Sequence, residues 1–195
     1  MKTTQQQGKG NRKEKVYAFI DSQNLNLGTR ANKWKLDYKK FRTYLKTKYN
    51  VEKAFLFIGF IAENQSLYTN LQEMGYLLVF KNVMQIMKDG KKTFKGNVDA
   101  ELVLHAMTEL KNYDKAVIVS GDGDFYCLIE YLDNEKKLGK IIVPNFVYSS
   151  LLKKYASKIL MLGSVKNKLQ YVERKSKKSQ EEKTSRTADI NTKKI

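Results

Sequence analysis

The segment VIVSGDGDF, residues 117–125, carries the features that decide the fold. Its β-branched run is typical of a buried strand, and Gly121 and Gly123 are typical of a tight turn from a strand into a helix that brings the backbone close to a ligand. Asp122 and Asp124 flank the second glycine directly after the strand. Because neighbouring carboxylates repel each other, this pair indicates more than a turn.

Short apolar runs alternate with amphipathic stretches between residues 15 and 162. Strands are expected at 16–20, 54–58, 76–80, 116–119 and 141–143, and helices at 36–48, 65–74, 98–110, 125–137 and 150–159. A turn at 88–91 indicates a β-hairpin between 83–87 and 92–94. Apolar strands that alternate with helices predict an α/β fold with a mostly parallel central sheet, covered on both faces, plus a small β-hairpin.

The charge is unevenly distributed along the 195 residues, whose net charge is +17. Residues 1–15 carry five basic and one acidic side chain, residues 164–195 carry ten and four, and the part between them holds the remaining +7. We therefore predict a flexible basic arm at 1–14, a folded domain at 15–163 and a basic, largely disordered tail at 164–195. This distribution favours a polyanionic partner, nucleic acid first, although lysine-rich tails can also serve only solubility.

The location follows from what the sequence lacks. It has no apolar signal-peptide region and no apolar run near the roughly 20 residues that a membrane-spanning helix needs, so we expect a soluble, cytoplasmic protein without a membrane partner. A single cysteine, Cys127, excludes a disulfide within the chain. Cys127 accompanies Leu128 and Tyr131 on an apolar helix face, so a buried structural thiol is expected.

Four aspartates are predicted to meet at one edge of the sheet. Asp21 follows the first strand in AFIDSQN, Asp122 and Asp124 follow the fourth, and Asp99 lies in the first turn of the preceding helix. In parallel sheets, ligands bind beyond the carboxyl ends of the strands. Because converging carboxylates need a compensating cation, and oxygen ligands without a Cys or His cluster suit hard ions, Mg²⁺ or Mn²⁺ is expected.

Each of these residues also has a structural interpretation. Asp21, Asp99 and Asp124 could cap helices, and Asp122 could hold a turn. Asn24 and Ser120 could contact a phosphate or merely stabilise a turn and a strand end. His105, the one histidine of the sequence, is expected to be a partly buried helix residue.

The motifs FIDSQNL, KGNVDAEL and VIVSGDGDF together resemble the NYN domain, in the LabA-like branch of the PIN-like nuclease superfamily. The resemblance implies a Rossmann-like three-layer sandwich over residues 15–162 and metal-dependent cleavage of RNA. By position it implies that Asp21, Asp122 and Asp124 hold one or two ions and that Asp99 completes the cluster. His105 stands where many relatives carry a further aspartate.

Substrate capture is assigned to the basic stretch KDGKKTFKG. It offers Lys92 and Lys95 for phosphate contacts and Phe94 for stacking on a base, although the favoured interpretation of Phe94 is a hairpin core residue. Single-stranded RNA is therefore the expected partner. Whether the chain also forms a homodimer stays open.

Three other functions compete with the nuclease. A nucleic-acid-binding module with little or no catalysis would share the fold. A phosphatase of the haloacid-dehalogenase type would need an aspartate where Gln23 stands, and an ion-regulated interaction protein would use the acids as a sensor.

Overall fold

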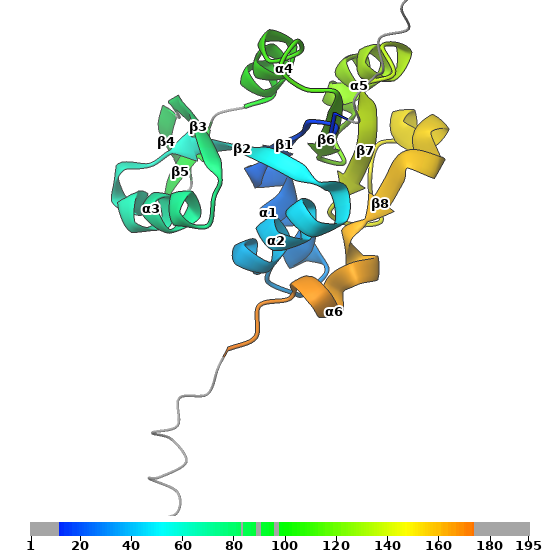
Figure 1. Ribbon diagram of the computed structural model, residues 1–195. Coiled ribbons are helices and arrows are strands. Elements are labelled where there is room, and N and C mark those ends of the chain that lie inside the picture. The colour runs from blue at the N-terminus through cyan, green and yellow to red at the C-terminus, as the bar shows by residue number, and fades with distance from the viewer. Residues whose placement is uncertain (1–11, 83, 89–90, 96–97, 174–195) are drawn as a thin grey trace, which may run out of the picture.

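The computed structural model describes residues 12–82, 84–88, 91–95 and 98–173, and for residues 82, 84–88 and 91–95 it describes the backbone alone. These residues form three layers, in which a central sheet lies between two layers of helices (Figure 1). The strands are β1 (Val16–Asp21), β2 (Val51–Phe60), β3 (Leu77–Asn82), β4 (Met84–Lys88), β5 (Lys91–Lys95), β6 (Lys115–Val119), β7 (Leu138–Val143) and β8 (Ile159–Met161). The α-helices are α1 (Ser22–Ala31), α2 (Tyr38–Tyr49), α3 (Gln65–Glu73), α4 (Asp99–Thr108), α5 (Tyr126–Asn134) and α6 (Lys166–Leu169). The 3-10 helices are η1 (Ala62–Asn64), η2 (Gly123–Phe125), η3 (Ser150–Lys158) and η4 (Leu162–Val165).

The sheet reverses its strand order at its centre. Within the described ranges, six parallel strands pair in the order β3-β2-β1-β6-β7-β8. The chain builds outward from β1 to β3 and then returns to the other side of β1 with β6. Ligands of open parallel sheets bind beyond the carboxyl ends of the strands at such a reversal. The predicted α/β sandwich with a parallel sheet is confirmed.

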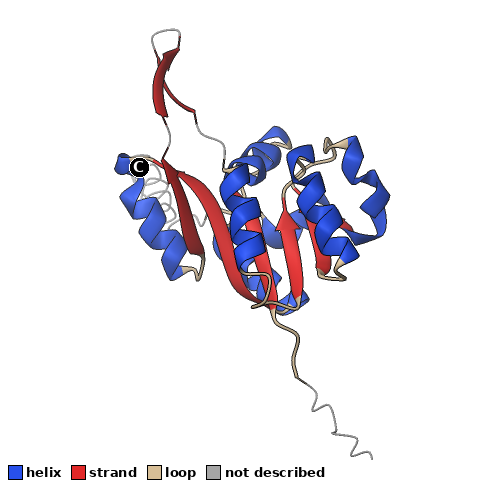
Figure 2. Ribbon diagram, turned by 90° about the horizontal axis from the view of Figure 1, so that it is seen from above, coloured by secondary structure: helices blue, strands red, loops and turns tan. Residues whose placement is uncertain are grey.

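The predicted hairpin is also confirmed. Strands β4 and β5 pair antiparallel, with Lys88 opposite Lys91. Figure 2 shows this hairpin beyond the edge of the sheet toward which the strand arrows point. The side chains of Lys92, Phe94 and Lys95 lie outside the described residues, so their predicted roles are untested.

The core occupies both faces of the sheet. Phe19 and Ile20 are neighbours in β1, and both are fully buried. Phe19 packs in one cluster with Leu102 of α4, whereas Ile20 packs in another with Leu25 of α1. A strand that is buried on both faces needs an apolar residue at every position, which explains the unbroken apolar runs.

Helix α1 follows β1 without a loop and is not among the predicted helices. Its residues are mostly polar, and Leu25 is its one fully buried apolar side chain. Two local features hold it instead. Asp21 caps its first turn, and Gly28 lies so close to Pro144 that a Cβ on Gly28 would come within 2.5 Å of the proline ring.

Two further details differ from the sequence-based expectation. Cys127 is exposed, so the prediction of a buried thiol is wrong. The reason is the register of α5, whose buried side is formed by Leu128, Ile129 and Leu132.

The folded part continues into the predicted tail. Strand β8, η4 and α6 follow residue 158, and Leu169 is buried beside α2, where Leu36 and Gln170 form a short bridge. Residues 1–11 and 174–195, which contain most of the predicted arm and tail, lie outside the described residues. Among the described residues, no helix combines the length and the apolar character needed to cross a membrane.

Candidate functional site

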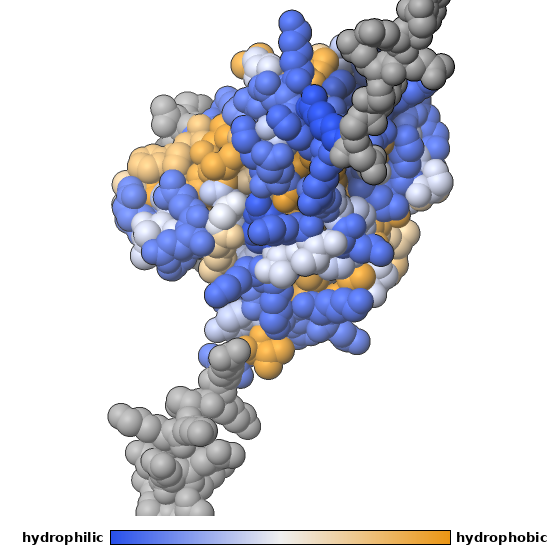
Figure 3. All heavy atoms as spheres, viewed as in Figure 1, coloured by the Kyte–Doolittle hydropathy of each residue, from blue (hydrophilic) through white to orange (hydrophobic). Residues whose placement is uncertain are grey.

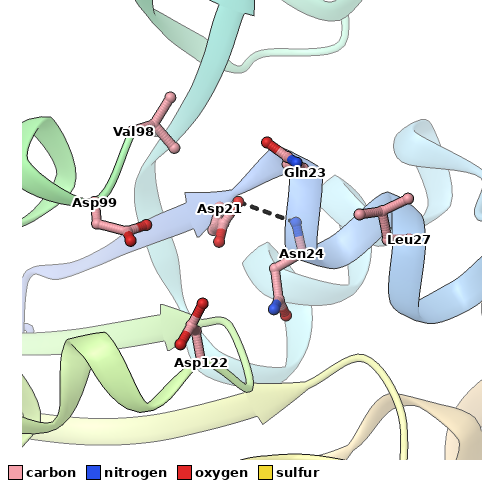
Figure 4. Close-up of a pocket in the computed structure, with 7 residues that line it drawn as sticks. All are labelled: Asp21, Gln23, Asn24, Leu27, Val98, Asp99 and Asp122. Atoms are coloured by element: carbon pink, nitrogen blue, oxygen red, sulfur yellow. Dashed lines mark hydrogen bonds between the residues drawn. The ribbon is translucent and has the colours of Figure 1, made fainter. Parts of the chain in front are cut away.

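A pocket of about 310 Å³ opens where β1 and β6 end. It is lined by Asp21, Gln23, Asn24, Leu27, Val98, Asp99 and Asp122. Figure 4 shows the carboxylates of Asp99 and Asp122 directed toward Asp21. The three acids come from three separate elements: the end of β1, the first turn of α4 and the loop after β6. The structure therefore brings together residues that are up to 101 positions apart in the sequence.

Asp21 lies deepest, with only 5% of its surface exposed. Its Oδ1 accepts a hydrogen bond from the backbone N–H of Asn24 (3.0 Å), and its Oδ2 accepts one from the hydroxyl of Ser120 (3.4 Å). Burial raises the pKa of Asp21, and the nearby charges of Asp99 and Asp122 raise it further, although the hydrogen bond from Asn24 acts in the opposite direction.

Three carboxylates meet nearer the surface. One oxygen each of Asp99, Asp122 and Asp124 lies within 4.8 Å of the others. Asp122 and Asp99 thus belong both to this group and to the pocket around Asp21. All four predicted acids lie in one region, but they divide into a buried residue and a more accessible group of three. These oxygen donors fit a hard divalent cation such as Mg²⁺ or Mn²⁺.

The loop after β6 is held by side chains predicted to contact substrate. The Oδ1 of Asn24 accepts a hydrogen bond from the N–H of Gly121 (3.0 Å), and the hydroxyl of Ser120 accepts one from the N–H of Asp122 (3.2 Å). Ser120 is almost fully buried. Both residues therefore fix the shape of the loop, and Asn24 also lines the pocket.

The acids that could cap helices differ in whether they do so. Asp21 caps α1, and Asp122 caps η2 through its Oδ1, which accepts the N–H of Asp124 (3.2 Å). Asp124 does not cap α5, whose N-terminal position is Phe125 without a side-chain bond. Asp99 is the first residue of α4, where the helix dipole favours a carboxylate. Capping accounts for parts of this arrangement, but not for the proximity of Asp99, Asp122 and Asp124.

The glycines of the loop allow close packing against the chain itself. A Cβ on Gly123 would lie 2.5 Å from the hydroxyl oxygen of Ser149, and one on Gly121 would lie 3.0 Å from the Cβ of Tyr148. The N–H of Ser149 donates to the carbonyl of Gly121 (2.9 Å). The close approach expected of these glycines is thus observed, but its partner is the segment after β7.

His105 is partly buried, as expected. Its ring lies edge-on to Phe55, with 4.4 Å between the centroids, and close to Phe57. Burial lowers its pKa, so the imidazole is neutral at pH 7. It adds no charge to the acidic site.

Sequence reasoning missed three of the pocket residues. Gln23 and Leu27 lie one turn apart on α1, and Val98 directly precedes α4. The sequence held a signal for the first two. An aspartate directly after a strand can cap a helix and so mark its start, and residues four apart on that helix, such as Gln23 and Leu27, share one face.

The NYN domain family model matches residues 15–163 of this chain. The chain therefore belongs to the NYN family, a branch of the PIN-like nuclease superfamily, and the predicted resemblance is confirmed. Membership suggests a nuclease or nucleic-acid-binding role.

Two relatives cover most of the chain. The low amplitude and bright protein LabA of Synechococcus elongatus is 22% identical over 170 residues, which span 84% of this chain and 91% of LabA. A crystal structure of a protein of unknown function from Vibrio parahaemolyticus is 24% identical, has a TM-score of 0.66 and covers 84% of this chain and all of its own. The latter supports the fold.

Proposed function

We propose that this protein is a divalent-metal-dependent nuclease that hydrolyses phosphodiester bonds in RNA. The observation that carries the proposal is the convergence of Asp99, Asp122 and Asp124 within 4.8 Å beside buried Asp21, at the reversal of the sheet. Like charges at this spacing repel each other, and a divalent cation relieves that repulsion.

The residues divide into two roles. Asp99, Asp122 and Asp124 would hold Mg²⁺ or Mn²⁺, and Asp21 would lie behind them, where a bound cation would favour its charged form. This differs from the family-based expectation, in which Asp99 is the auxiliary residue, because Asp21 is the more buried and Asp99 is in the group of three. A bound ion would lower the pKa of a water molecule and neutralise charge on the phosphoryl group in the transition state.

The chain's own groups supply alignment. Asn24 and Ser120 hold the loop that carries Asp122, through bonds of 3.0 and 3.2 Å. The ring of His105 packs against Phe55 and Phe57 and does not line the pocket, so it is not the base of this mechanism. Lys92 and Lys95 would bind the phosphates of single-stranded RNA. A cytoplasmic location, and a basic arm and tail on either side of the folded part, belong to the same proposal.

A nucleic-acid-binding module without catalysis is the second candidate. It is favoured by His105, which stands where the family often has a further acid, and by the engagement of Asn24 in holding the loop. Both candidates predict RNA binding, so only turnover separates them.

The test is cleavage of labelled single- and double-stranded RNA and DNA with Mn²⁺ or with a chelator. The variant Asp122→Asn keeps a side-chain oxygen that can accept the N–H of Asp124, so it preserves the turn and removes the charge. Glu135→Gln, an exposed carboxylate after α5, is the matched control.

We expect Mn²⁺-dependent cleavage of RNA by the natural chain and by the control, and RNA binding without cleavage by Asp122→Asn. Cleavage that survives the chelator or Asp122→Asn would refute the metal mechanism. RNA binding by the natural chain without cleavage in the presence of Mn²⁺ would establish the second candidate.

A further inference from the structure

The positive charge of the folded part is concentrated in one segment. Residues 30–50 contain eight basic residues and one acidic residue, a net charge of +7. This equals the whole surplus of residues 16–163, so the remainder of that region is electrically balanced. The segment comprises the end of α1, the following loop and α2, on the opposite face of the sheet from α4 and α5 (Figure 1). Charge gathered in this way attracts polyanions.

A groove of about 530 Å³ follows the basic helix α2. It is lined by Asp37, Lys39, Lys40, Thr43, Tyr44, Thr47, Lys168 and Leu169. Among the described residues, Lys39 and Lys168 have no acidic partner within ion-pair distance, and both are exposed. The surface over α2 is largely hydrophilic in Figure 3.

Among the described residues, the one acid that lines this groove is already engaged. Asp37 caps α2, because its Oδ1 accepts the N–H of Lys40 (3.0 Å). Its other carboxylate oxygen lies 3.8 Å from the ammonium of Lys40, which also donates to the carbonyl of Gln170 (2.8 Å). Asp37 and Lys40 therefore compensate each other, and Lys39 and Lys168 give the groove its positive charge.

The basic surface continues past the groove toward the C-terminal end of the described part. The ammonium of Lys35 lies 4.7 Å from the ring centroid of Tyr171, whose N–H donates to the carbonyl of Lys35 (2.8 Å). Beyond Glu173, residues 174–195 add eight basic and three acidic residues by sequence. The excess charge of the tail is thus attached next to the excess charge of α2.

We propose that the groove between α2 and α6 binds the sugar–phosphate backbone of single-stranded RNA, at a site separate from the acidic pocket. This inference rests on the proposed function in taking RNA as the substrate. Lys46 is exposed just outside the groove lining, seven residues from Lys39 on α2, so the two lysines lie on one face about 10 Å apart. A row of cations of this length matches a linear polyanion, which contacts several of them at once.

Two other polyanions fit less well. A helix that binds a membrane surface needs an exposed apolar face, but Phe41 and Leu45 of α2 are fully buried in the core. A protein partner would need exposed aromatic or aliphatic anchors in the groove. Among the described residues, the two such side chains that line it are Tyr44, which is half-buried, and Leu169, which is fully buried.

The test measures RNA affinity against salt concentration with the full-length chain carrying Asp122→Asn, so that the RNA stays intact. The groove variant adds Lys39→Gln and Lys168→Gln in the groove and Lys46→Gln beside it. Each lost phosphate contact lowers the slope of log affinity against log salt by about 0.7 for a single strand, so a reduction of about 2 is expected. Affinity at low salt should fall about tenfold or more.

The matched control removes the same charge elsewhere, through Lys111→Gln, Lys136→Gln and Lys153→Gln. These exposed residues follow α4 and α5 or lie in η3. The control should keep the salt slope of the natural chain to within about 0.7. An unchanged slope in the groove variant would overturn the proposal, as would an equal loss in the control. Loss of binding to phosphatidylserine vesicles with intact RNA binding would also overturn it, in favour of a membrane surface.

A separate measurement keeps this inference apart from the proposed nuclease activity. With Asp122 restored, the groove variant should cut a dinucleotide as fast as the natural chain, because the single phosphodiester of this substrate is the bond that is cut and no further phosphate is left for the groove. If the natural chain cuts no RNA, the proposed function fails, while the salt dependence still decides whether the groove binds RNA.

Discussion

The substitution Gly123→Ala tests whether packing against the segment after β7 sets the geometry of the acidic site. Gly123 lies between Asp122 and Asp124, and an added Cβ would lie 2.5 Å from the hydroxyl oxygen and 3.1 Å from the Cβ of Ser149. The hydroxyl can rotate away only by losing its role as cap of η3, where it accepts the N–H of Leu151 (3.4 Å). The Cβ of Ser149 cannot rotate at all.

The expected cost follows from these contacts. Overpacking of this kind costs about 1–3 kcal/mol, which includes the loss of a cap worth about 1 kcal/mol. For a domain of this size, 1 kcal/mol shifts the melting temperature by about 3 °C, so Gly123→Ala should melt about 3–9 °C lower. Displacement of Asp122 or Asp124 by even 1 Å should also lower the cleavage rate about a hundredfold.

Thermal unfolding of four variants isolates the contact. In the double variant Gly123→Ala with Ser149→Ala, the hydroxyl oxygen closest to the new Cβ is gone. The double variant should therefore lose less stability than the sum of the losses in the two single variants. Gly163→Ala is the control, since its nearest neighbour would be a ring carbon of Phe146 at 3.7 Å. There, the smaller entropy of the unfolded chain should stabilise by about 0.4–1 kcal/mol. Equal melting temperatures for Gly123→Ala and the natural chain would refute the reasoning.

Three further predictions concern charge. Asp21→Asn should stabilise the metal-free protein at pH 7, because it removes a carboxylate whose pKa is raised by burial. The gain should vanish below pH ~3.8, where the carboxyl is protonated in both the folded and the unfolded protein. Chemical denaturation at the two pH values measures the difference. Mn²⁺ at a hundredfold excess over its dissociation constant should stabilise the natural chain by about 2.7 kcal/mol, and thermal unfolding should show no such gain for Asp122→Asn but a full gain for Glu135→Gln. Arg42→Lys should lower the free energy of unfolding by about 1–3 kcal/mol, because the Arg42 guanidinium donates to three backbone carbonyls on and beside β2 and β3, at 2.8–3.3 Å. It should leave the salt dependence of RNA binding unchanged, because Arg42 does not line the groove.

The position of the acids could be predicted because it depends on few assumptions. The apolar run before Ser120 requires a buried strand, and parallel strands place their carboxyl ends at one edge. Asp21 and Asp122 follow such strands, so their proximity in the pocket needs no knowledge of the loops. Asp99 could be placed because the helix that it starts must lead back to the next strand of the same sheet.

What could not be predicted depends on contacts between distant residues. The contact between Gly123 and Ser149 joins segments that no local pattern relates. Helix α1 is held by its cap and by the approach of Gly28 to Pro144, neither of which leaves an apolar periodicity. The division of the acids also escaped prediction, because sequence position says nothing of depth below the surface, and depth makes Asp21 the buried member.

The acidic pocket and the basic segment 30–50 lie on different parts of this protein, which explains how a negatively charged pocket could bind a negatively charged RNA. Without a cation, the carboxylates at the end of β1 and β6 repel a phosphate that comes within the Debye length of about 8 Å at physiological salt. Attraction must then come from elsewhere, and the net charge of +7 in residues 30–50 supplies it on another face. A chelator should therefore stop cleavage but leave most RNA binding, which should depend on Lys39 and Lys168. If the chelator abolished binding as well, the pocket with its metal would be the binding site, and the basic face of α2 would serve only solubility.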